Sequence, residues 1–135
     1  MKKVMFVETS DSGIRDLYRE TFPKLGIPYQ EFPSHIEAKN SFNKEEFYGL
    51  VTNIGNDSYN GFQLIKYLLD QEFSAENILV VSGWKPLIVN EELFKLEEKN
   101  DLKRGTIGFI KKGSLGLVPV IKRTFSRKNL EERTA

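Results

Sequence analysis

Four short apolar runs along the chain predict buried strands. They are Val4–Val7, Leu50–Ile54, Ile78–Val81 and Ile107–Ile110. Runs of this length are typical of strands that are covered on both faces of a parallel sheet. Segments with helical spacing lie between them, and this alternation favours right-handed βαβ units.

Two amphipathic stripes predict helices. The first has the spacing i, i+3, i+4, i+7, i+8 and i+11 and consists of Ile14, Leu17, Tyr18, Thr21, Phe22 and Leu25. Gly26 follows directly and is typical of a helix C-terminus. The second stripe follows Asn60, a favourable N-cap residue, and consists of Phe62, Ile65, Leu69 and Phe73.

Three further helices have weaker signals. Ser34 and Glu37 form a capping-box pattern for a short helix. Asn90 precedes an acidic segment and marks the expected start of a charged helix. Pro119 fits the first turn of a last helix, where its missing N–H costs nothing.

The remaining strand fixes the expected order of the sheet. Residues 27–33 must supply the second strand, yet they are polar and carry prolines at positions 28 and 33. Proline cannot donate to a strand ladder, so this strand belongs at an edge. We therefore predict an α/β fold with a doubly wound, five-stranded parallel sheet in the flavodoxin-like order 2-1-3-4-5.

This order brings polar residues at several strand ends together. The carboxyl ends of the first and third strands are neighbours at the switch point of such a sheet, where ligands bind. Glu8, Thr9 and Asn53 are expected to converge there, with Ser82 and Lys112 nearby.

The segment Gly49-Leu-Val-Thr-Asn-Ile-Gly-Asn-Asp-Ser-Tyr-Asn-Gly61 carries a family resemblance. It contains a buried strand, a polar residue at the strand end, a loop and a glycine that opens a helix. It resembles the receiver domain of two-component response regulators. In that family an aspartate at the strand end takes a phosphoryl group, and the glycine follows at the spacing of Asn53 and Gly61. Here asparagine occupies the acceptor position.

Other strand ends extend the resemblance over nearly the whole chain. Glu8 and Thr9 stand where the family has two acidic magnesium ligands, so one carboxylate is retained. Ser82 matches the hydroxyl residue of the fourth strand, and Lys112 matches the lysine of the fifth. Phe109 falls at the aromatic switch position. Gly113 replaces the proline that normally follows the lysine.

The resemblance, with these departures, implies a degenerate pseudo-receiver. A carboxamide cannot form an acyl phosphate, and Glu8 alone should hold magnesium poorly, because this ion prefers several oxygen ligands and gives up water reluctantly. We expect an ion pair between Lys112 and Glu8, with Asn53 bridging by hydrogen bonds. This predicts a frozen polar cluster with no catalytic residue, no metal and no cofactor.

Two further residues are candidates for phosphorylation, Asp57 and His35. Asp57 lies in the loop after Asn53 and is either an alternative phosphate acceptor or, as we favour, a turn residue. His35 is the single histidine of the chain. A solvated surface histidine is the expectation for it, because a phosphohistidine role would need a helical bundle.

Composition fits one domain in the cytoplasm. The chain has 135 residues, a net charge of +1 and no cysteine, so disulfide and thiolate chemistry are excluded. No apolar run approaches the roughly 20 residues that span a bilayer, and no signal-peptide core follows the first residues. We expect a receiver-like domain at residues 1–126 and a C-terminal tail at residues 127–135.

The expected activity is protein binding and not catalysis. The resemblance implies a protein partner, or a second copy of this chain, on the surface of the fourth helix, fifth strand and fifth helix. The fourth helix is expected to present acidic residues and the fifth a basic run: Glu91, Glu92, Glu97, Glu98 and Asp101 on one, Lys122, Arg123, Arg127 and Lys128 on the other. The net charge of +1 gives no field that would draw the chain to nucleic acid or acidic membranes, so neither is an expected partner.

A flavodoxin-like phosphate or flavin site is the alternative. The loop Thr9-Ser-Asp-Ser-Gly13 lies between a strand and a helix, where a helix N-terminus attracts anions. Tyr59 and Trp84 follow later strands and offer rings for stacking. However, Asp11 would repel phosphate, and this reading accounts for neither Lys112 nor the spacing of Asn53 and Gly61.

Overall fold

A computed structural model describes residues 2–113 and 116–125, and a five-stranded parallel sheet forms its centre. The sheet order is β2-β1-β3-β4-β5, as predicted from the prolines of the second strand. The strands are β1 (Lys3–Val7), β2 (Tyr29–Phe32), β3 (Phe47–Thr52), β4 (Ile78–Ser82) and β5 (Gly108–Lys111). The predicted tail at residues 127–135, with Arg127 and Lys128, lies outside the described residues.

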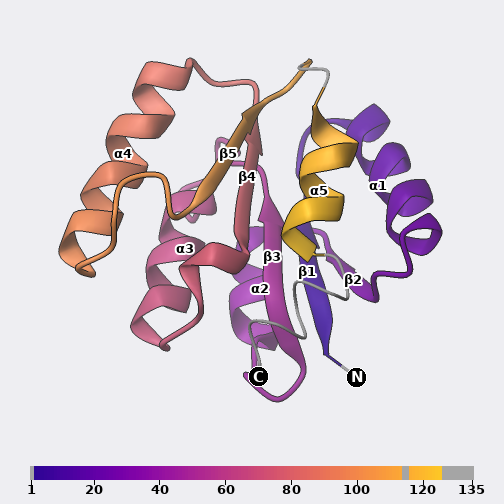
Figure 1. The fold of residues 1–135 in the computed structure, drawn as a ribbon, viewed down its shortest axis with the longest axis horizontal. Coiled ribbons are helices and arrows are strands. Elements are labelled where there is room, and N and C mark those ends of the chain that lie inside the picture. The colour runs from indigo at the N-terminus through magenta and orange to yellow at the C-terminus, as the bar shows by residue number, and fades with distance from the viewer. Residues whose placement is uncertain (1, 114–115, 126–135) are drawn as a thin grey trace.

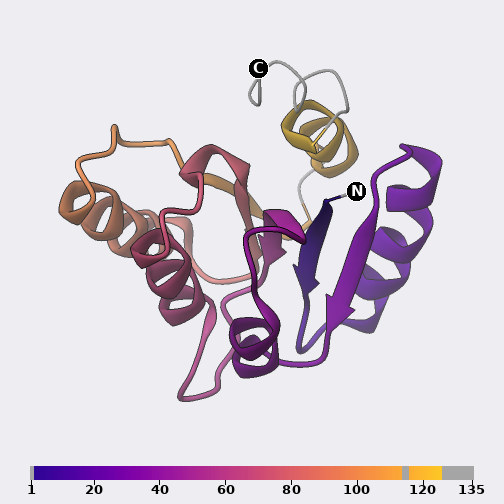
Figure 2. The same cartoon turned by 90° about the horizontal axis from the view of Figure 1, so that it is seen from below.

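Helices cover both faces of this sheet (Figures 1 and 2). One face carries α1 (Ser12–Lys24) and α5 (Leu117–Phe125). The other carries α2 (His35–Ser41), α3 (Gly61–Asp70) and α4 (Pro86–Lys99), and a short 3₁₀ turn, Ala75–Asn77, precedes β4. This three-layer arrangement is the doubly wound α/β fold that the alternation of strands and helices predicts.

The two cores follow from the period-two geometry of the strands. In β1, Val4 and Phe6 pack with α1 and α5, whereas Met5 and Val7 pack with the helices of the opposite face. Successive side chains of a strand point to opposite faces, so a continuous apolar run is needed where both faces are covered. All four of these side chains are fully buried.

Gly49 lets α5 approach the centre of the sheet. A Cβ atom at this position of β3 would lie 2.7 Å from a ring carbon of Phe125, which is 1% exposed. The ring of Phe125 fills the space that the glycine leaves, so the last turn of α5 rests directly on β3.

Helix ends mostly match the sequence signals. Asn60 forms a reciprocal capping box with Gln63 at the start of α3, and the Ser34 hydroxyl accepts a hydrogen bond from the N–H of Glu37. Pro119 lies in the first turn of α5, as expected. Gly26 has a positive φ of 68° directly beyond the C-cap of α1.

Two predicted boundaries are wrong. The strand expected at Leu50–Ile54 runs from Phe47 to Thr52, so Asn53 follows the strand instead of ending it. The charged helix expected to start after Asn90, at Glu91, begins five residues earlier, at Pro86. Proline is favoured in the first turn of a helix because it lacks the backbone N–H that would have no partner there. Pro86 therefore marks the start of α4, ahead of the acidic segment on which the prediction relied.

No helix within residues 2–113 and 116–125 has the length and apolar character required to cross a membrane.

Candidate functional site: a closed polar cluster at the strand ends

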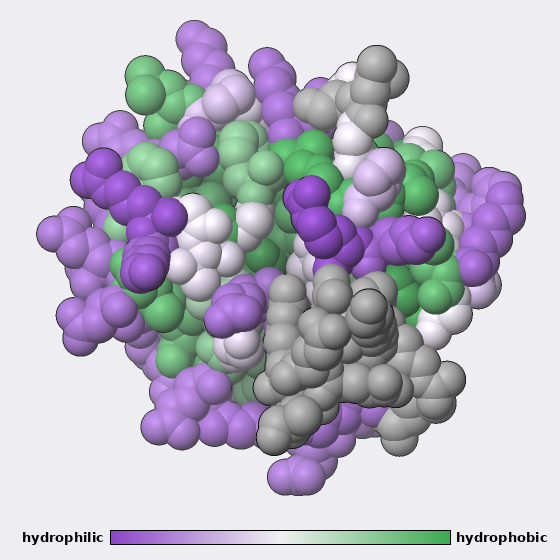
Figure 3. Space-filling model, in the orientation of Figure 1, coloured by the Kyte–Doolittle hydropathy of each residue, from purple (hydrophilic) through white to green (hydrophobic). Residues whose placement is uncertain are grey.

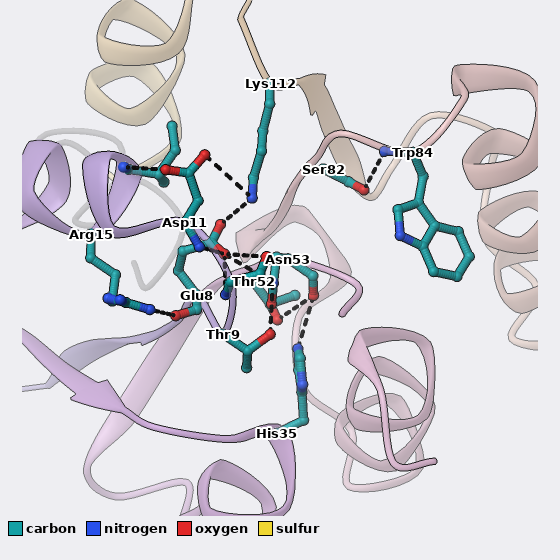
Figure 4. Close-up of polar contacts among 12 residues, drawn as sticks. Glu8, Thr9, Asp11, Arg15, His35, Thr52, Asn53, Ser82, Trp84 and Lys112 are labelled. Atoms are coloured by element: carbon teal, nitrogen blue, oxygen red, sulfur yellow. Dashed lines mark hydrogen bonds and ion pairs between the residues drawn. The ribbon is translucent and has the colours of Figure 1, made fainter. Parts of the chain in front are cut away.

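Glu8, Thr9, Asn53 and Lys112 converge at the carboxyl edge of the sheet, as the strand order predicts (Figure 4). Glu8 and Thr9 follow β1, Asn53 follows β3 and Lys112 follows β5. The N–H of Asn53 donates to the carbonyl of Val7, and this hydrogen bond fixes the register of residue 53 relative to β1. Parallel strands thus bring together side chains that are more than forty positions apart in the sequence.

Both carboxylate oxygens of Glu8 already have partners. Its Oε1 lies 2.8 Å from Nζ of Lys112. Its Oε2 accepts from Nδ2 of Asn53 at 3.0 Å and from the main-chain N–H groups of Ser10 and Asp11 at 3.0 and 3.1 Å. Glu8 is 3% exposed, and a buried charge requires this degree of compensation. Each oxygen of Glu8 is thus engaged by at least one partner within the fold.

Asn53 links the two strand ends through its amide. Its Nδ2 donates to Oγ1 of Thr9 at 2.9 Å as well as to Glu8. Its Oδ1 is buried and has no hydrogen-bond partner among the described residues. An aspartate here would place a second negative charge directly beside Glu8, so the amide suits a cluster with one carboxylate and one lysine.

Gly61 is required by the main chain of Asn53. A Cβ atom at position 61 would overlap the carbonyl oxygen of Asn53 and lie 3.0 Å from Cα of Ile54. The N–H of Gly61 donates to the carbonyl of Ile54 at 2.8 Å. The spacing that identified this segment therefore has a steric cause.

His35 corrects the prediction of a surface histidine. It is fully buried, and its Nε2 lies 3.0 Å from the carbonyl oxygen of Asn53. A carbonyl oxygen only accepts hydrogen bonds, so Nε2 carries a proton and donates it. The buried Nδ1 has no partner among the described residues. Burial lowers the pKa of His35, and the hydrogen bond to Asn53 and the charges of Asp57 and Glu8 oppose this shift.

A sequence signal for His35 existed but was ambiguous. The residue follows Ser34, the N-cap of α2, and so starts a short helix directly after the edge strand. This position faces the loop after β3, since Oγ1 of Thr52 and Nε2 of His35 both donate to the same carbonyl of Asn53.

Arg15 is a further residue that the sequence analysis did not single out. Its guanidinium donates to the carbonyl of Glu8 at 3.1 Å and so connects α1 to the end of β1.

Ser82 and Phe109 lie at the positions that the strand pattern predicts, and Ser82 is engaged by a hydrogen bond and Phe109 by packing. The Ser82 hydroxyl accepts a hydrogen bond from the N–H of Trp84 at 3.0 Å, and the residue is 1% exposed. Phe109 is partly buried and packs on the core beneath α3 and α4. Gly113, in place of the family proline, has a φ of 90°, which a proline could not adopt.

A small cleft of about 210 Å³ lies beside the cluster. Its lining includes Asn53, Ser82, Gly83 and Lys112. Within the described part of the chain, no three His, Cys, Asp or Glu side chains are grouped so that they could hold a metal ion. Asp57, the alternative acceptor, is exposed in the loop beyond Gly55.

The loop expected to bind flavin phosphate is already satisfied internally. Glu8 accepts from the N–H groups of Ser10 and Asp11, and the Asp11 side chain caps α1 by accepting from the N–H of Ile14. The two candidate stacking rings are also occupied: Trp84 packs edge-to-face on Phe62, and Tyr59 lies under the ammonium of Lys39. The flavodoxin-like alternative is therefore not favoured.

The sequence matches no family model and no curated protein, whereas its fold matches solved structures over the full length. The receiver domain of the Francisella response regulator 1452 aligns with a TM-score of 0.72 at 19% identity and covers 100% of both chains. A receiver domain protein from Clostridium thermocellum gives 0.69 at 15% identity and covers 97% of this chain and 99% of its own. The Vibrio cholerae chemotaxis protein CheY4 gives 0.64 at 16% identity, with 98% of each chain covered.

The chain has the receiver fold. Within this fold, the cluster occupies the edge of the sheet where the resemblance places the phosphoacceptor pocket. Asn53, Thr9 and Gly113 are the three positions at which it departs from the pattern that the resemblance implies.

The surface of α4 differs from the prediction. Glu97, expected among the exposed acidic residues of the fourth helix, is 1% exposed and accepts from the N–H groups of Gly105 and Ile107 at 3.2 and 2.9 Å. Asp101 lies beyond the end of α4 with a positive φ of 56°. The buried Glu97 fastens α4 to the loop that leads into β5.

Proposed function

We propose that the protein is a non-phosphorylatable pseudo-receiver that acts in signalling by binding a protein partner. The fold supports a module related to response regulators. The observation that carries the proposal is the hydrogen bonding of Glu8: both of its oxygens are occupied by Lys112, Asn53 and the main chain. A group that is fully used inside the fold is not available to assemble a phosphoryl-transfer site.

Phosphoryl transfer depends on positioning and on electrostatic stabilisation of the moving group. In this protein the nucleophile position holds an amide whose nitrogen is committed to Glu8 and Thr9. The ammonium of Lys112 is committed to Glu8 and lies 3.9 Å from Oδ2 of Asp11. The amide at the acceptor position is not a nucleophile and Lys112 is already paired, and both observations support binding over catalysis.

The surface of α4, β5 and α5 is the proposed binding face, as the resemblance implies. A partner protein or a second copy of the chain is the proposed occupant, and nucleic acid and membrane are not. The cytoplasmic location, the domain limits at residues 1–126 and the absence of a metal or cofactor remain predictions.

The test is exposure of the protein to acetyl phosphate and magnesium, followed by intact-mass measurement. We expect no gain of a phosphoryl group, whereas an active receiver treated in parallel is modified. A gain that maps to Asp57 would revive the alternative acceptor, and any stable acid-sensitive gain would overturn the proposal.

A further inference from the structure

A cavity of about 290 Å³ lies at the amino edge of the sheet, the edge opposite the polar cluster. Two connections form it: one leads from the end of α3 through the 3₁₀ turn to β4, and the other leads from the end of α4 to β5. Figure 1 shows α3 and α4 on the same side of the sheet, each ending toward the lower edge of the view. In the same orientation, Figure 3 shows pale and hydrophobic surface left of centre, bordered by hydrophilic side chains.

The buried part of the lining is apolar. Leu69, Phe73 and Ala75 are buried, and Leu102 is partly buried against the same core. Hydrocarbon that covers such side chains is removed from water, which favours binding. The cavity has the volume of roughly ten water molecules, so it admits a ligand of about ten non-hydrogen atoms.

The polar part of the lining presents mainly hydrogen-bond acceptors. Nδ2 of Asn100 and Oγ1 of Thr106 already donate to main-chain carbonyls, at 2.8 and 2.6 Å. Main-chain N–H groups of the lining also donate to carbonyls within the fold, namely those of Glu72, Phe73, Asn100, Leu102 and Thr106. A ligand that fits this lining must therefore supply donors of its own.

The charge of the lining is negative. Glu72 and Glu76 line the cavity, and among the described residues no basic side chain does. Residues 69–77 include three acidic residues and no basic one. Residues 98–106 carry two acidic and three basic residues, and the basic ones, Lys99, Lys103 and Arg104, are exposed outside the lining. The C-terminus of α3, with no basic residue in its last turn, adds the negative end of a helix dipole.

Glu72 is an unfavourable residue for the end of a helix. It follows Gln71, the C-cap of α3, with a φ of 62°, where glycine is the usual residue. Its carboxylate also lies at the negative end of the helix dipole. A side chain that breaks two local rules without an evident gain in stability is typical of a functional position.

Lys44 shows which group Glu72 attracts. Its Nζ lies 3.6 Å from Oε2 of Glu72, and the two side chains are 52% and 89% exposed. An ion pair this exposed contributes little free energy, so the ammonium group of a ligand can replace that of Lys44.

We infer that this cavity binds a small aliphatic diamine. The two ammonium groups donate to Glu72, Glu76 and the neighbouring acceptor oxygens, and the methylene chain covers Leu69, Phe73 and Leu102. A carboxylate offers about four lone-pair sites, so each glutamate accepts from the ligand in addition to its partners in the fold. The site lies at the opposite edge of the sheet from Glu8, and this inference is independent of the proposed function.

The test is an NMR titration of the full chain with 1,5-diaminopentane at constant ionic strength. The comparison ligands are 1,5-pentanediol, an uncharged molecule of the same length, and glutarate, its anionic counterpart. Amide signals of residues 69–76 and 100–106 should shift saturably with the diamine alone, with a Kd on the order of 1 mM for a ligand of this size. Lys44→Gln should strengthen binding by about threefold, because it removes a competing ammonium group.

Two variants of Glu72 separate binding from stability. Glu72→Gln should weaken binding by about fivefold. Glu72→Gly should weaken it equally and yet raise the urea midpoint of unfolding, because glycine adopts the left-handed conformation without strain. Glu91→Gln is the matched control: Glu91 is an exposed glutamate 4.0 Å from Lys95, outside the cavity, and its loss should leave binding unchanged.

Four results would overturn the inference. They are an absence of saturable shifts with the diamine, equal shifts with pentanediol or glutarate, unchanged binding by Glu72→Gln, and a loss of binding in Glu91→Gln as large as that in Glu72→Gln. None of these results bears on the phosphodonor experiment, because no variant touches Glu8 or Asn53.

Discussion

The imidazole of His35 donates a hydrogen bond of 3.0 Å to the carbonyl oxygen of Asn53, and this bond joins α2 to the polar cluster. The same carbonyl accepts from the Thr52 hydroxyl at 2.8 Å. The main chain of residue 53 is therefore held from two sides, while its side chain is held by Glu8 and Thr9. Both the main chain and the side chain of residue 53 are therefore held by hydrogen bonds.

Acid should destabilise the protein through His35. Its folded-state pKa lies below the usual value because of burial, so the unfolded chain takes up the proton first as pH falls. The neutral imidazole stabilises the fold above a pH of about 6.5. As pH falls below that value, the free energy of unfolding decreases by at most about 1.4 kcal/mol per pH unit. Urea unfolding between pH 7.5 and 5.5 measures this.

His35→Gln supplies the control for that measurement. Glutamine retains a donor for the Asn53 carbonyl but does not titrate. The variant should lose the pH dependence between 7.5 and 5.5 that the wild type shows. An identical pH slope in both proteins would assign the effect to carboxylates instead of His35.

Magnesium at millimolar concentration should leave the amide spectrum and the fluorescence of Trp84 unchanged. Glu8 is the one carboxylate at the strand ends that the family pattern retains, and its oxygens are already occupied. The double variant Thr9→Asp, Asn53→Asp is expected to gain magnesium binding, because a hard cation binds where several carboxylates converge. Saturable shifts around Glu8 in the wild-type protein would contradict this.

Asn53→Asp alone should not restore a switch. A switch needs a two-state element that the phosphoryl group biases. In this protein the hydroxyl of Ser82 accepts a hydrogen bond from the N–H of Trp84. Glu97 on α4 accepts one from the following loop. Beryllofluoride added to the double variant should shift amide signals near residues 9 and 53 and leave those of residues 86–99 in place. Coherent shifts along α4 would show that the switch is intact.

Glu97→Gln should loosen the connection between α4 and β5. One amide oxygen cannot replace two carboxylate oxygens, so the N–H of Gly105 or Ile107 loses its partner, at a cost of about 1–3 kcal/mol. Hydrogen exchange of these two amides should accelerate. Glu98→Gln, which changes an exposed neighbour, should leave exchange at both positions as it is.

The sequence allowed the sheet order and the meeting of strand ends to be predicted because both follow from simple constraints. Prolines excluded the second strand from the interior, and parallel strands bring their carboxyl ends to one edge. The ion pair of Glu8 and Lys112 then follows from their opposite charges, whereas Asn53 bridges Glu8 and Thr9. These parts of the structure need no knowledge of how individual side chains pack.

Burial of polar residues was predicted poorly. His35 and Glu97 are both buried against main-chain groups that become partners only in the folded chain. A histidine after a cap and a glutamate in a charged helix are usually exposed, and no local pattern distinguishes these two. The early start of α4 was missed for a related reason, because Leu87 and Ile88 are apolar yet exposed and do not follow the helical stripe.

Gly61→Ala should be strongly destabilising because the added methyl group has no room. It would meet the main chain of Asn53 and Ile54, which cannot rotate away as a side chain can, and we expect a loss of about 3 kcal/mol. Gly13→Ala in α1 is the control: its Cβ would lie 3.4 Å from Oδ1 of Asp11, the N-cap residue, and alanine should stabilise that helix by up to about 1 kcal/mol. Equal stabilities of the two variants in urea would refute the steric account.

The collision at position 61 involves backbone and not the acceptor side chain, so it exists whether residue 53 is aspartate or asparagine. Selection for phosphorylation can disappear while the demand for glycine eight positions later stays in force. The spacing of the two positions is thus set by main-chain packing and is independent of the chemistry at residue 53. Searches for receivers that have lost their acidic residues should weight this glycine above the carboxylates.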